Sequence, residues 1–193
     1  PTGVDFNSVT YGNDKFVAVA YYTDKGAYSA DGITWTEFTF ASNYWKSVTY
    51  GNGKFVAVAS STQYGSLGAY STDGISWSTM TLPTNSNWSS VTYGDGKFVA
   101  VAASSQSGAY STDGIHWTAF TMSASRSWYG VTYGNGKFVA VAGNSANGAY
   151  WKAAGDVTYS ISGTSITANS DILMELTDEG GVKAYSMEAG NIT

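Results

Sequence analysis

The chain has 193 residues and a formal net charge of −5; 43% of its residues are hydrophobic and only 12% are charged. Such a chain can bury a core, whereas its lack of cysteine and its single histidine, His116, argue against disulfides, thiolate or histidine metal sites and a cysteine or serine–histidine nucleophile. Basic residues are too few for binding a phosphate backbone, and no apolar run approaches the roughly 20 residues of a membrane helix, so we expect no nucleic-acid partner and no membrane insertion.

A repeat of about 40 residues dominates the sequence. Each copy begins with a segment of the type Ser-Val-Thr-Tyr-Gly-Asn-Gly-Lys-Phe-Val-Ala-Val-Ala, and these segments lie at 8–20, 47–59, 90–102 and 130–142. A Gly-Ala-Tyr triplet follows in every copy. In the first three copies it leads into Ser-x-Asp-Gly-Ile-x-Trp, at 29–35, 71–77 and 111–117. The fourth copy departs from this second motif after Tyr150.

Each copy is predicted to form four short strands. In the second copy the strands are expected at 47–50, 54–59, 69–72 and 76–82, with tight turns at Gly51-Asn52-Gly53 and Asp73-Gly74. The second of these strands is apolar on both faces, which predicts that both faces are buried. We find no sustained 3.6-residue apolar period and therefore expect little helix.

Tandem units of this size with four antiparallel strands are typical of propeller blades. One blade cannot cover its own two apolar faces, so neighbouring blades must cover them, and the repeats must close on themselves or be capped. We therefore predict an all-β fold, a small β-propeller of four repeated four-stranded blades.

The Ser-x-Asp-Gly-Ile-x-Trp motif resembles the Asp-box of sialidase-type and related propellers. It lies where that family has the motif, in the hairpin between the third and fourth strands, and the resemblance covers about residues 6 to 155. It implies a structural role, in which the aspartate accepts backbone hydrogen bonds across the turn and the tryptophan packs between strands. The whole repeat is similar to repeats in tail-fibre and other virion proteins of bacteriophages and in some bacterial surface proteins.

The segment 156–193 does not repeat and is treated as a separate unit from the repeats at 1–155. Strands are expected at 157–162, 165–167, 172–177 and 182–187, the first of them as the outer strand of the fourth blade. The segment forms either a divergent fifth blade, completed by residues 4–6, or a small β extension that docks on a neighbour; we favour the fifth blade. Because the sequence begins with Pro1 and not with Met, we expect a processed form or part of a longer protein.

The tryptophans fall into two repeated sets. Trp35, Trp77 and Trp117 belong to the Asp-Gly motifs, and Trp45, Trp88 and Trp128 each precede a first strand. Both sets are predicted to pack in the core, and the alternative for the second set is a sugar-stacking platform. Trp151 has no counterpart in the other copies, and its role is left open.

Catalysis is not expected from these residues. The sialidase family holds its substrate carboxylate with three arginines, and Arg126 is the only arginine here. Glycoside hydrolysis needs two carboxylates across a cleft, but Asp31, Asp73 and Asp113 are expected to serve the turns. We therefore predict a binding protein that is not an enzyme and has no catalytic residue, no metal and no cofactor.

Loops that vary between copies predict the binding surface. In a four-stranded meander the loops between the second and third strands share one face with the links between blades. The variable loops are 21–25, 60–67, 103–107 and 143–147, and the variable links are 41–44, 83–87 and 123–127. Their tyrosine, serine, asparagine and glutamine residues suit neutral sugars or a protein epitope; the alternative is that they are only solvated loops. The candidate ligand-binding residues are Tyr22, Tyr44, Gln63, Tyr64, Asn87 and Arg126.

The resemblance implies a binding module of a bacteriophage virion, of tail-fibre or receptor-binding type, that recognises host-surface glycan or protein. Other virion subunits are a second expected partner, through residues 156–193. One alternative is a structural or decoration virion protein with no ligand, and another is a secreted bacterial lectin or adhesin. The expected location is the virion, outside the cell, with a secreted or cell-surface protein as the alternative.

Overall fold

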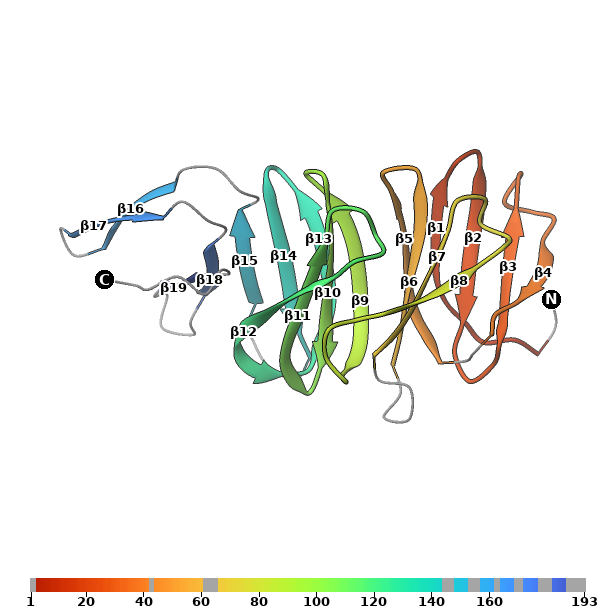
Figure 1. Cartoon of the computed structure of the whole chain (residues 1–193), viewed down its shortest axis with the longest axis horizontal. Coiled ribbons are helices and arrows are strands. Elements are labelled where there is room, and N and C mark those ends of the chain that lie inside the picture. The colour runs from red at the N-terminus through yellow and green to blue at the C-terminus, as the bar shows by residue number, and fades with distance from the viewer. Residues whose placement is uncertain are drawn as a thin grey trace.

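The computed structural model describes residues 3–41, 44–60, 66–143 and 148–152, together with four strands between 157 and 186. Every regular element among these residues is a β-strand (Figure 1). The described part of the chain thus contains no helix that is long and apolar enough to cross a membrane.

The strands form four antiparallel meanders, which are the four blades. Blade one contains β1 (Phe6–Gly12), β2 (Lys15–Ala20), β3 (Lys25–Ser29) and β4 (Thr36–Thr39). Blade two contains β5 (Trp45–Gly51), β6 (Lys54–Ala59), β7 (Leu67–Ser71) and β8 (Ser78–Thr81). Blade three contains β9 (Asn87–Gly94), β10 (Lys97–Ala103), β11 (Ser105–Ser111) and β12 (Thr118–Arg126). Blade four contains β13 (Trp128–Gly134), β14 (Lys137–Ala142), β15 (Gly148–Lys152), β18 (Ile172–Leu176) and β19 (Val182–Ser186).

The blades are those of a β-propeller. Their first strands, β1, β5, β9 and β13, lie next to one another in chain order, and each meander runs outward from its first strand. The predicted all-β propeller of four repeated blades is therefore confirmed.

The first hairpin of each blade turns on two residues with left-handed backbone. In blade two these are Asn52, with φ of 45°, and Gly53, with φ of 72°. Asn and Gly tolerate this region, and two such residues in succession give the turn that matches the twist of paired strands. The repeated Gly-Asn-Gly-Lys sequence thus fixes the register of the hairpin, which pairs Tyr50 with Phe55 and Gly51 with Lys54.

Each seam between neighbouring blades is closed by the apolar second strands. In the seam between blades one and two, Val17 and Val19 of β2 pack against Phe55, Ala57 and Ala59 of β6, and all five side chains are fully buried. The predicted burial of both faces of this strand is confirmed, because Val56 and Val58 of β6 are buried in the next seam.

The tryptophans before the first strands also lie in the seams, as predicted for core residues. Trp45, Trp88 and Trp128 are fully buried in the three seams. Trp151 is buried as well: its ring stacks on Phe138 and meets Phe120 of blade three edge-on, with ring centroids 5.6 Å apart in both pairs. This contact replaces the one made in blade two, where Trp77 stacks on Phe38 of the preceding blade.

A tyrosine ring of one blade covers a glycine of the blade before it in every seam. The pairs are Gly12 with Tyr50, Gly51 with Tyr93, and Gly94 with Tyr133. Glycine is needed at these positions, because a Cβ at any of the three would overlap atoms of the tyrosine ring.

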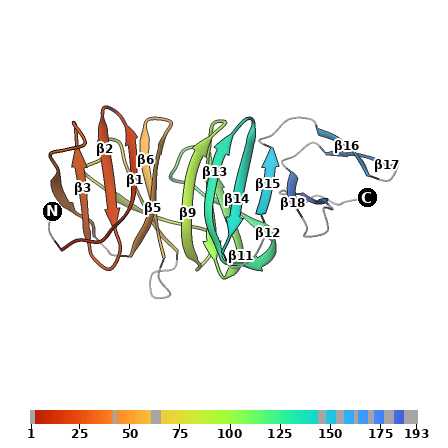
Figure 2. The ribbon, with the colours of Figure 1, turned by 180° about the vertical axis from the view of Figure 1, so that it is seen from behind.

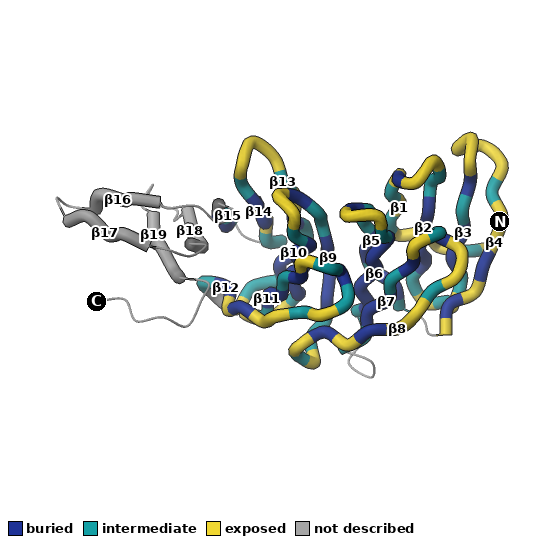
Figure 3. Tube along the Cα trace, turned by 45° about the horizontal axis from the view of Figure 1, so that its top comes forward, coloured by how far each residue is buried: buried dark blue, intermediate teal, exposed yellow. Residues whose placement is uncertain are grey.

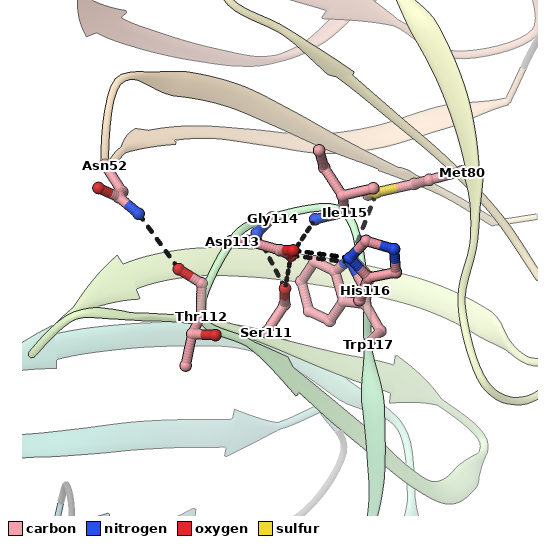
Figure 4. A network of polar contacts seen from close by, with 9 residues as sticks. All are labelled: Asn52, Met80, Ser111, Thr112, Asp113, Gly114, Ile115, His116 and Trp117. Carbon is pink, nitrogen blue, oxygen red and sulfur yellow. Dashed lines mark hydrogen bonds and ion pairs between the residues drawn. The ribbon is translucent and has the colours of Figure 1, made fainter.

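Polar contacts accompany these rings. Asn13 Nδ2 donates to the carbonyl of Thr72 (3.3 Å), and Asn52 Nδ2 donates to the carbonyl of Thr112 (3.2 Å; Figure 4). The turn of one blade is thereby joined to the Asp-Gly turn of the next. Backbone amides of the first strands also donate to serines of the preceding blade, at 3.1 Å in each case; the pairs are Val48 with Ser8, Val91 with Ser47, and Val131 with Ser90.

Blade one and blade four lie at opposite ends of the described chain (Figures 1 and 2). Val9 of β1 and Val141 of β14 are exposed there, whereas their counterparts in the seams are buried. Figure 3 shows the blades side by side in an open arrangement. Among the described residues, the three seams between neighbours do not bring blade four back to blade one, so the expectation that the repeats close or are capped is not met there.

The end of the chain is arranged differently from the prediction for its first strand. Strands occur near all four expected positions, but β15 pairs with β18, and not with β16 (Val157–Ile161). β16 instead pairs with β17 (Thr164–Ala168) in a sheet of their own. The prediction that 157–162 is the outer strand of blade four is therefore wrong. Phe6 is the first residue of β1 in blade one, so it does not complete a fifth blade.

Candidate functional site

The described loops between second and third strands lie at the same end of the blades as the links between blades. Backbone hydrogen bonds join them: Tyr21 N–H donates to the Asp5 carbonyl (3.1 Å), and Ser60 N–H donates to the Tyr44 carbonyl (3.0 Å). We call this end the loop face. The Asn-Gly and Asp-Gly turns occupy the opposite end, the turn face.

Three tyrosines gather on the loop face where blades one and two meet. We name Tyr21, Tyr22 and Tyr44 the tyrosine cluster; its ring centroids lie 4.1 to 5.8 Å apart. Lys46 Nζ lies over the Tyr21 ring, 4.1 Å from its centroid, and makes a cation–π contact with it. Tyr22 is 71% exposed, while the other two rings are half-buried and support it. The cluster therefore presents an aromatic surface with hydroxyl groups to solvent.

Burial and the neighbouring hydroxyl groups raise the pKa of the Tyr21 side chain. Its phenol therefore stays protonated at neutral pH and can donate as well as accept a hydrogen bond. A stacked ring surface with neutral donors and acceptors can bind the apolar face and the hydroxyls of a sugar, or a side chain of a protein.

The backbone at two members of the cluster is strained. Tyr22 has φ of 62° and Tyr44 has φ of 68°, in the left-handed region that residues with a bulky side chain rarely adopt. Such strain costs on the order of 1–3 kcal/mol and is found preferentially at binding and catalytic sites. The left-handed backbone at two bulky residues whose rings meet in one exposed cluster is the geometric reason to regard this cluster as the candidate site.

The structure brings together only some of the predicted ligand-binding residues. Tyr22 and Tyr44 meet in the cluster, whereas Gln63 and Tyr64 lie outside the described residues. Asn87 and Arg126 belong to blade three, at the first residue of β9 and the last residue of β12, and both are half-buried.

Tyr21 and Lys46 of the site were missed. The signal for Tyr21 was its place beside Tyr22 in the same variable loop. Lys46 could have been found by alignment of the repeats, because it stands where Asn7, Ser89 and Tyr129 stand in the other copies.

Two predicted loop segments of blade three are instead mostly strand. β10 extends to Ala103 and β11 begins at Ser105, so Ser104 alone, with φ of 54°, makes the connection. Ser105 pairs with Arg126, which extends β12 over most of the predicted link 123–127. The loop face of blade three is therefore a continued hairpin and not a flexible loop.

The three Asp-Gly motifs form turns held by their own side chains. In blade three, Asp113 Oδ1 accepts hydrogen bonds from the N–H groups of Ile115 and His116 (both 2.8 Å) and from Ser111 Oγ (3.0 Å; Figure 4). His116 Nδ1 also lies 2.7 Å from the other oxygen of Asp113. The His116 ring is exposed, so this pair lies at the surface of the turn face.

These hydrogen bonds lower the pKa values of the aspartates. At Asp31 the N–H groups of Thr34 and Ile33 and the Ser29 hydroxyl lower the pKa to about 2. At Asp73 partial burial opposes the shift, but the N–H groups of Ile75 and Ser76 and the Ser71 hydroxyl outweigh it and lower the pKa to about 2. These carboxylates therefore remain ionised as acceptors within their turns.

Acid is expected to destabilise the fold through these turns. The pKa of aspartate is lower in the folded chain than its unfolded value of about 3.9, so the stabilisation is complete above that pH and is lost as pH falls from about 4 to about 2. Asp73→Ala removes the acceptor for three donors and is expected to lower the unfolding free energy at neutral pH by about 1–3 kcal/mol. Urea unfolding across this pH range measures both effects.

The control for this experiment is Asp95→Asn, which places in blade three the residue found at Asn13, Asn52 and Asn135 in the corresponding turns. It should leave the unfolding free energy nearly unchanged. An Asp73→Ala variant with wild-type stability and wild-type acid sensitivity would contradict the structural role of the motif.

Among the described residues, no three histidine, aspartate or glutamate side chains lie together as a metal-binding group. An open apolar hollow of about 240 Å³ lies in blade four and is lined by Lys137, Val139, Gly148, Ala149 and Tyr150. It lies at the exposed end of the row of blades, away from the tyrosine cluster.

No family model matches this chain, and no curated protein matches it. Similar solved structures are β-propeller proteins. A catalytically inactive virginiamycin B lyase from Staphylococcus aureus, solved with quinupristin, has 11% identity and a TM-score of 0.67, over 99% of this chain and 73% of that one. A nidogen/laminin complex has 8% identity and a TM-score of 0.59, over 76% and 59% of the two chains. YCF48 bound to a D1 peptide has 13% identity and a TM-score of 0.54, over 96% and 64%.

The prediction that this chain is not an enzyme is contradicted by these similarities. The matched structures include virginiamycin B lyase and a streptogramin B lyase, which are enzymes with the same kind of fold. At these identities the similarity shows the fold alone, and that fold is compatible with catalysis.

Proposed function

We propose that this chain is a ligand-binding propeller module of a bacteriophage virion, of tail-fibre or receptor-binding type, that recognises host-surface glycan or protein. The setting comes from the similarity of its repeats, with their Asp-box motifs, to repeats of such virion proteins. The binding surface is the loop face, and its centre is the tyrosine cluster.

The observation that carries the proposal is the strained, exposed aromatic surface. Tyr22 is exposed although it is a large aromatic residue, and its ring is held by Tyr21 and Tyr44 at centroid distances of 4.1 and 5.8 Å. Rigid aromatic side chains contribute large contact areas at a small cost in conformational entropy. The cation–π contact of Lys46 fixes Tyr21 beneath this surface.

The matched structures offer a parallel for a protein ligand. YCF48 was solved with a bound D1 peptide, and nidogen was solved in complex with laminin. These names describe those proteins, and they support the general point that a propeller of this kind can present a binding surface to a partner.

Binding to a glycan array and to a panel of bacterial cells tests the proposal. The wild-type chain is expected to bind, and Tyr22→Ala is expected to weaken binding about tenfold or more, since an exposed aromatic anchor contributes at least about 1.4 kcal/mol. Tyr22→Phe keeps the ring and is expected to retain most of the affinity. Failure of the folded wild-type chain to bind any glycan or cell would overturn the proposal.

The matched control is Tyr129→Ala, which removes an exposed tyrosine of blade four, outside the cluster. It should bind as the wild type does. Equal losses in Tyr22→Ala and Tyr129→Ala would mean that binding does not depend on the cluster.

A second candidate, a structural role in the virion, is supported by the two exposed blade ends. Val9 and Val141 present apolar surface that a packed neighbour would cover. A structure of the assembled particle distinguishes the two roles: a structural role predicts a loop face buried in subunit contacts, and the binding role predicts a loop face turned toward solvent.

A further inference from the structure

The two ends of the propeller carry the two halves of one interface. In every seam, one blade contributes the valine face of its second strand and the next blade contributes the opposite face, with its first-strand valine and tyrosine. In the described chain, no other blade covers the valine face of blade four or the opposite face of blade one.

The exposed fractions identify these halves. Val139 and Val141 of β14 are 39% and 55% exposed, whereas their counterparts in the seams are fully buried; these are Val17, Val19, Val56, Val58, Val99 and Val101. Val9 of β1 is 59% exposed, whereas its counterparts Val48, Val91 and Val131 are at most 8% exposed. Both ends are thus built like seam surfaces, but they have no partner in the described chain.

The glycine and tyrosine pairs of the seams also indicate that blade four is complementary to blade one. Gly134 of blade four is the counterpart of the covered glycines, but a Cβ placed on it would meet nothing within 4 Å. Tyr11 of blade one is the counterpart of the covering tyrosines, and it is 56% exposed. Tyr11 of one copy therefore fits on Gly134 of another, as Tyr50 does on Gly12.

The asparagines of the turns carry independent information. Asn13 and Asn52 donate to Asp-Gly turns of the following blades, whereas blade three, which is followed by a blade without that motif, has Asp95 at this position. Blade four again has an asparagine, Asn135, although no Asp-Gly turn follows it in the described chain. In the described chain, the Asp-Gly turn of blade one receives no such hydrogen bond from another blade. In this turn Ala30 occupies the position of Thr72 and Thr112, so its carbonyl is the equivalent acceptor.

The hollow of blade four lies where a seam would receive the Asp-Gly turn of the next blade. Within a seam, a Cβ at Gly74 would lie 2.7 Å from Cγ2 of Val17 and 3.4 Å from Cδ of Lys15. The corresponding pair in blade four is Val139 and Lys137, which line the hollow. At Gly32, the counterpart of Gly74 in blade one, the three atoms nearest to an added Cβ all belong to Phe16 of its own blade.

We propose that copies of this chain associate head to tail, with the valine face of blade four of one copy packed on blade one of the next. The partner is a second copy because each exposed half is complementary to the other and unlike itself, which is the condition for a heterologous contact. The head-to-tail contact lacks one hydrogen bond of the seams. Gly130 of blade four stands where Ser8, Ser47 and Ser90 supply a hydroxyl that accepts from a valine N–H. This inference does not depend on the proposed ligand binding.

Sedimentation velocity and light scattering on the full chain test this contact. The wild type is expected to have at least twice the mass of one chain at micromolar concentration. Val9→Lys and Val141→Lys alter exposed side chains and should leave the far-UV circular dichroism unchanged. Each variant alone is expected to be monomeric, because a charge at either half blocks every head-to-tail contact.

A mixture of the two variants is the decisive measurement. Val9→Lys retains an intact blade four, and Val141→Lys retains an intact blade one, so the mixture is expected to form a heterodimer with twice the mass of one chain. Thr79→Lys, on the exposed side of β8, is the control and should assemble as the wild type does. A monomeric wild type, assembly of either variant alone, or no heterodimer in the mixture would overturn the proposal.

Discussion

The Trp88→Ala variant is expected to lose about 3–5 kcal/mol of unfolding free energy, which is the cost of removing a large, fully buried aromatic side chain. Trp88 is completely buried between blades two and three. Its cluster includes Val56 of β6, Met80 of β8 and Leu82 of the link that follows β8. Its indole N–H has no hydrogen-bond partner among the described residues, so the loss comes from packing alone. Urea unfolding followed by circular dichroism measures it.

Phe6→Ala is the matched control for this variant. Phe6 occupies the same position in blade one but is 39% exposed, because no blade of the described chain covers it. Its truncation is expected to cost about 1 kcal/mol or less, since little apolar surface is lost from the core. Similar losses of unfolding free energy in the two variants would show that burial between two blades is not the source of the stability that Trp88 contributes.

Gly51→Ala is expected to lower the unfolding free energy by about 1–3 kcal/mol, the usual cost of overpacking a well-packed core. The added Cβ would overlap the Tyr93 ring, which lies on Gly51 and packs against Phe98 at a centroid distance of 4.7 Å. The ring would have to leave the seam between blades two and three. Thermal and urea unfolding at low protein concentration measure this loss.

Gly134→Ala is the control, because it makes the same substitution at the same position of blade four, where a Cβ meets nothing within 4 Å. It is expected to leave the stability unchanged or to raise it by up to about 1 kcal/mol, because alanine restricts the unfolded chain more than glycine does. Equal effects at Gly51 and Gly134 would contradict the role assigned to the Tyr93 ring.

The blades could be predicted from sequence because their strongest signals are local. Asn52-Gly53 specifies a tight turn through the backbone angles it tolerates, and the alternation of Phe55, Val56, Ala57 and Val58 specifies two buried faces. The open ends could not be predicted. Val139 and Val9 have the same local sequence as buried valines of the other copies, so the pattern does not reveal which faces have a neighbour.

The candidate site was predictable only in part. Tyr22 and Tyr44 stand out because aromatic residues are unusual in variable polar loops, but their meeting across a seam depends on the angle between two blades. The same is true of Lys46, whose contact with Tyr21 joins a strand of blade two to a loop of blade one. The strand β18 was missed as the partner of β15 because the two strands are separated by residues 153–171, and pairing over such a distance leaves no local pattern.

All three seams join blades that are neighbours along the chain, and this has a consequence for synthesis on the ribosome. A blade needs only the preceding blade to bury its inner face, so its core can be completed before later segments are translated. The valine face of the newest blade remains uncovered until the next one emerges. The growing chain would therefore expose one apolar blade face at a time.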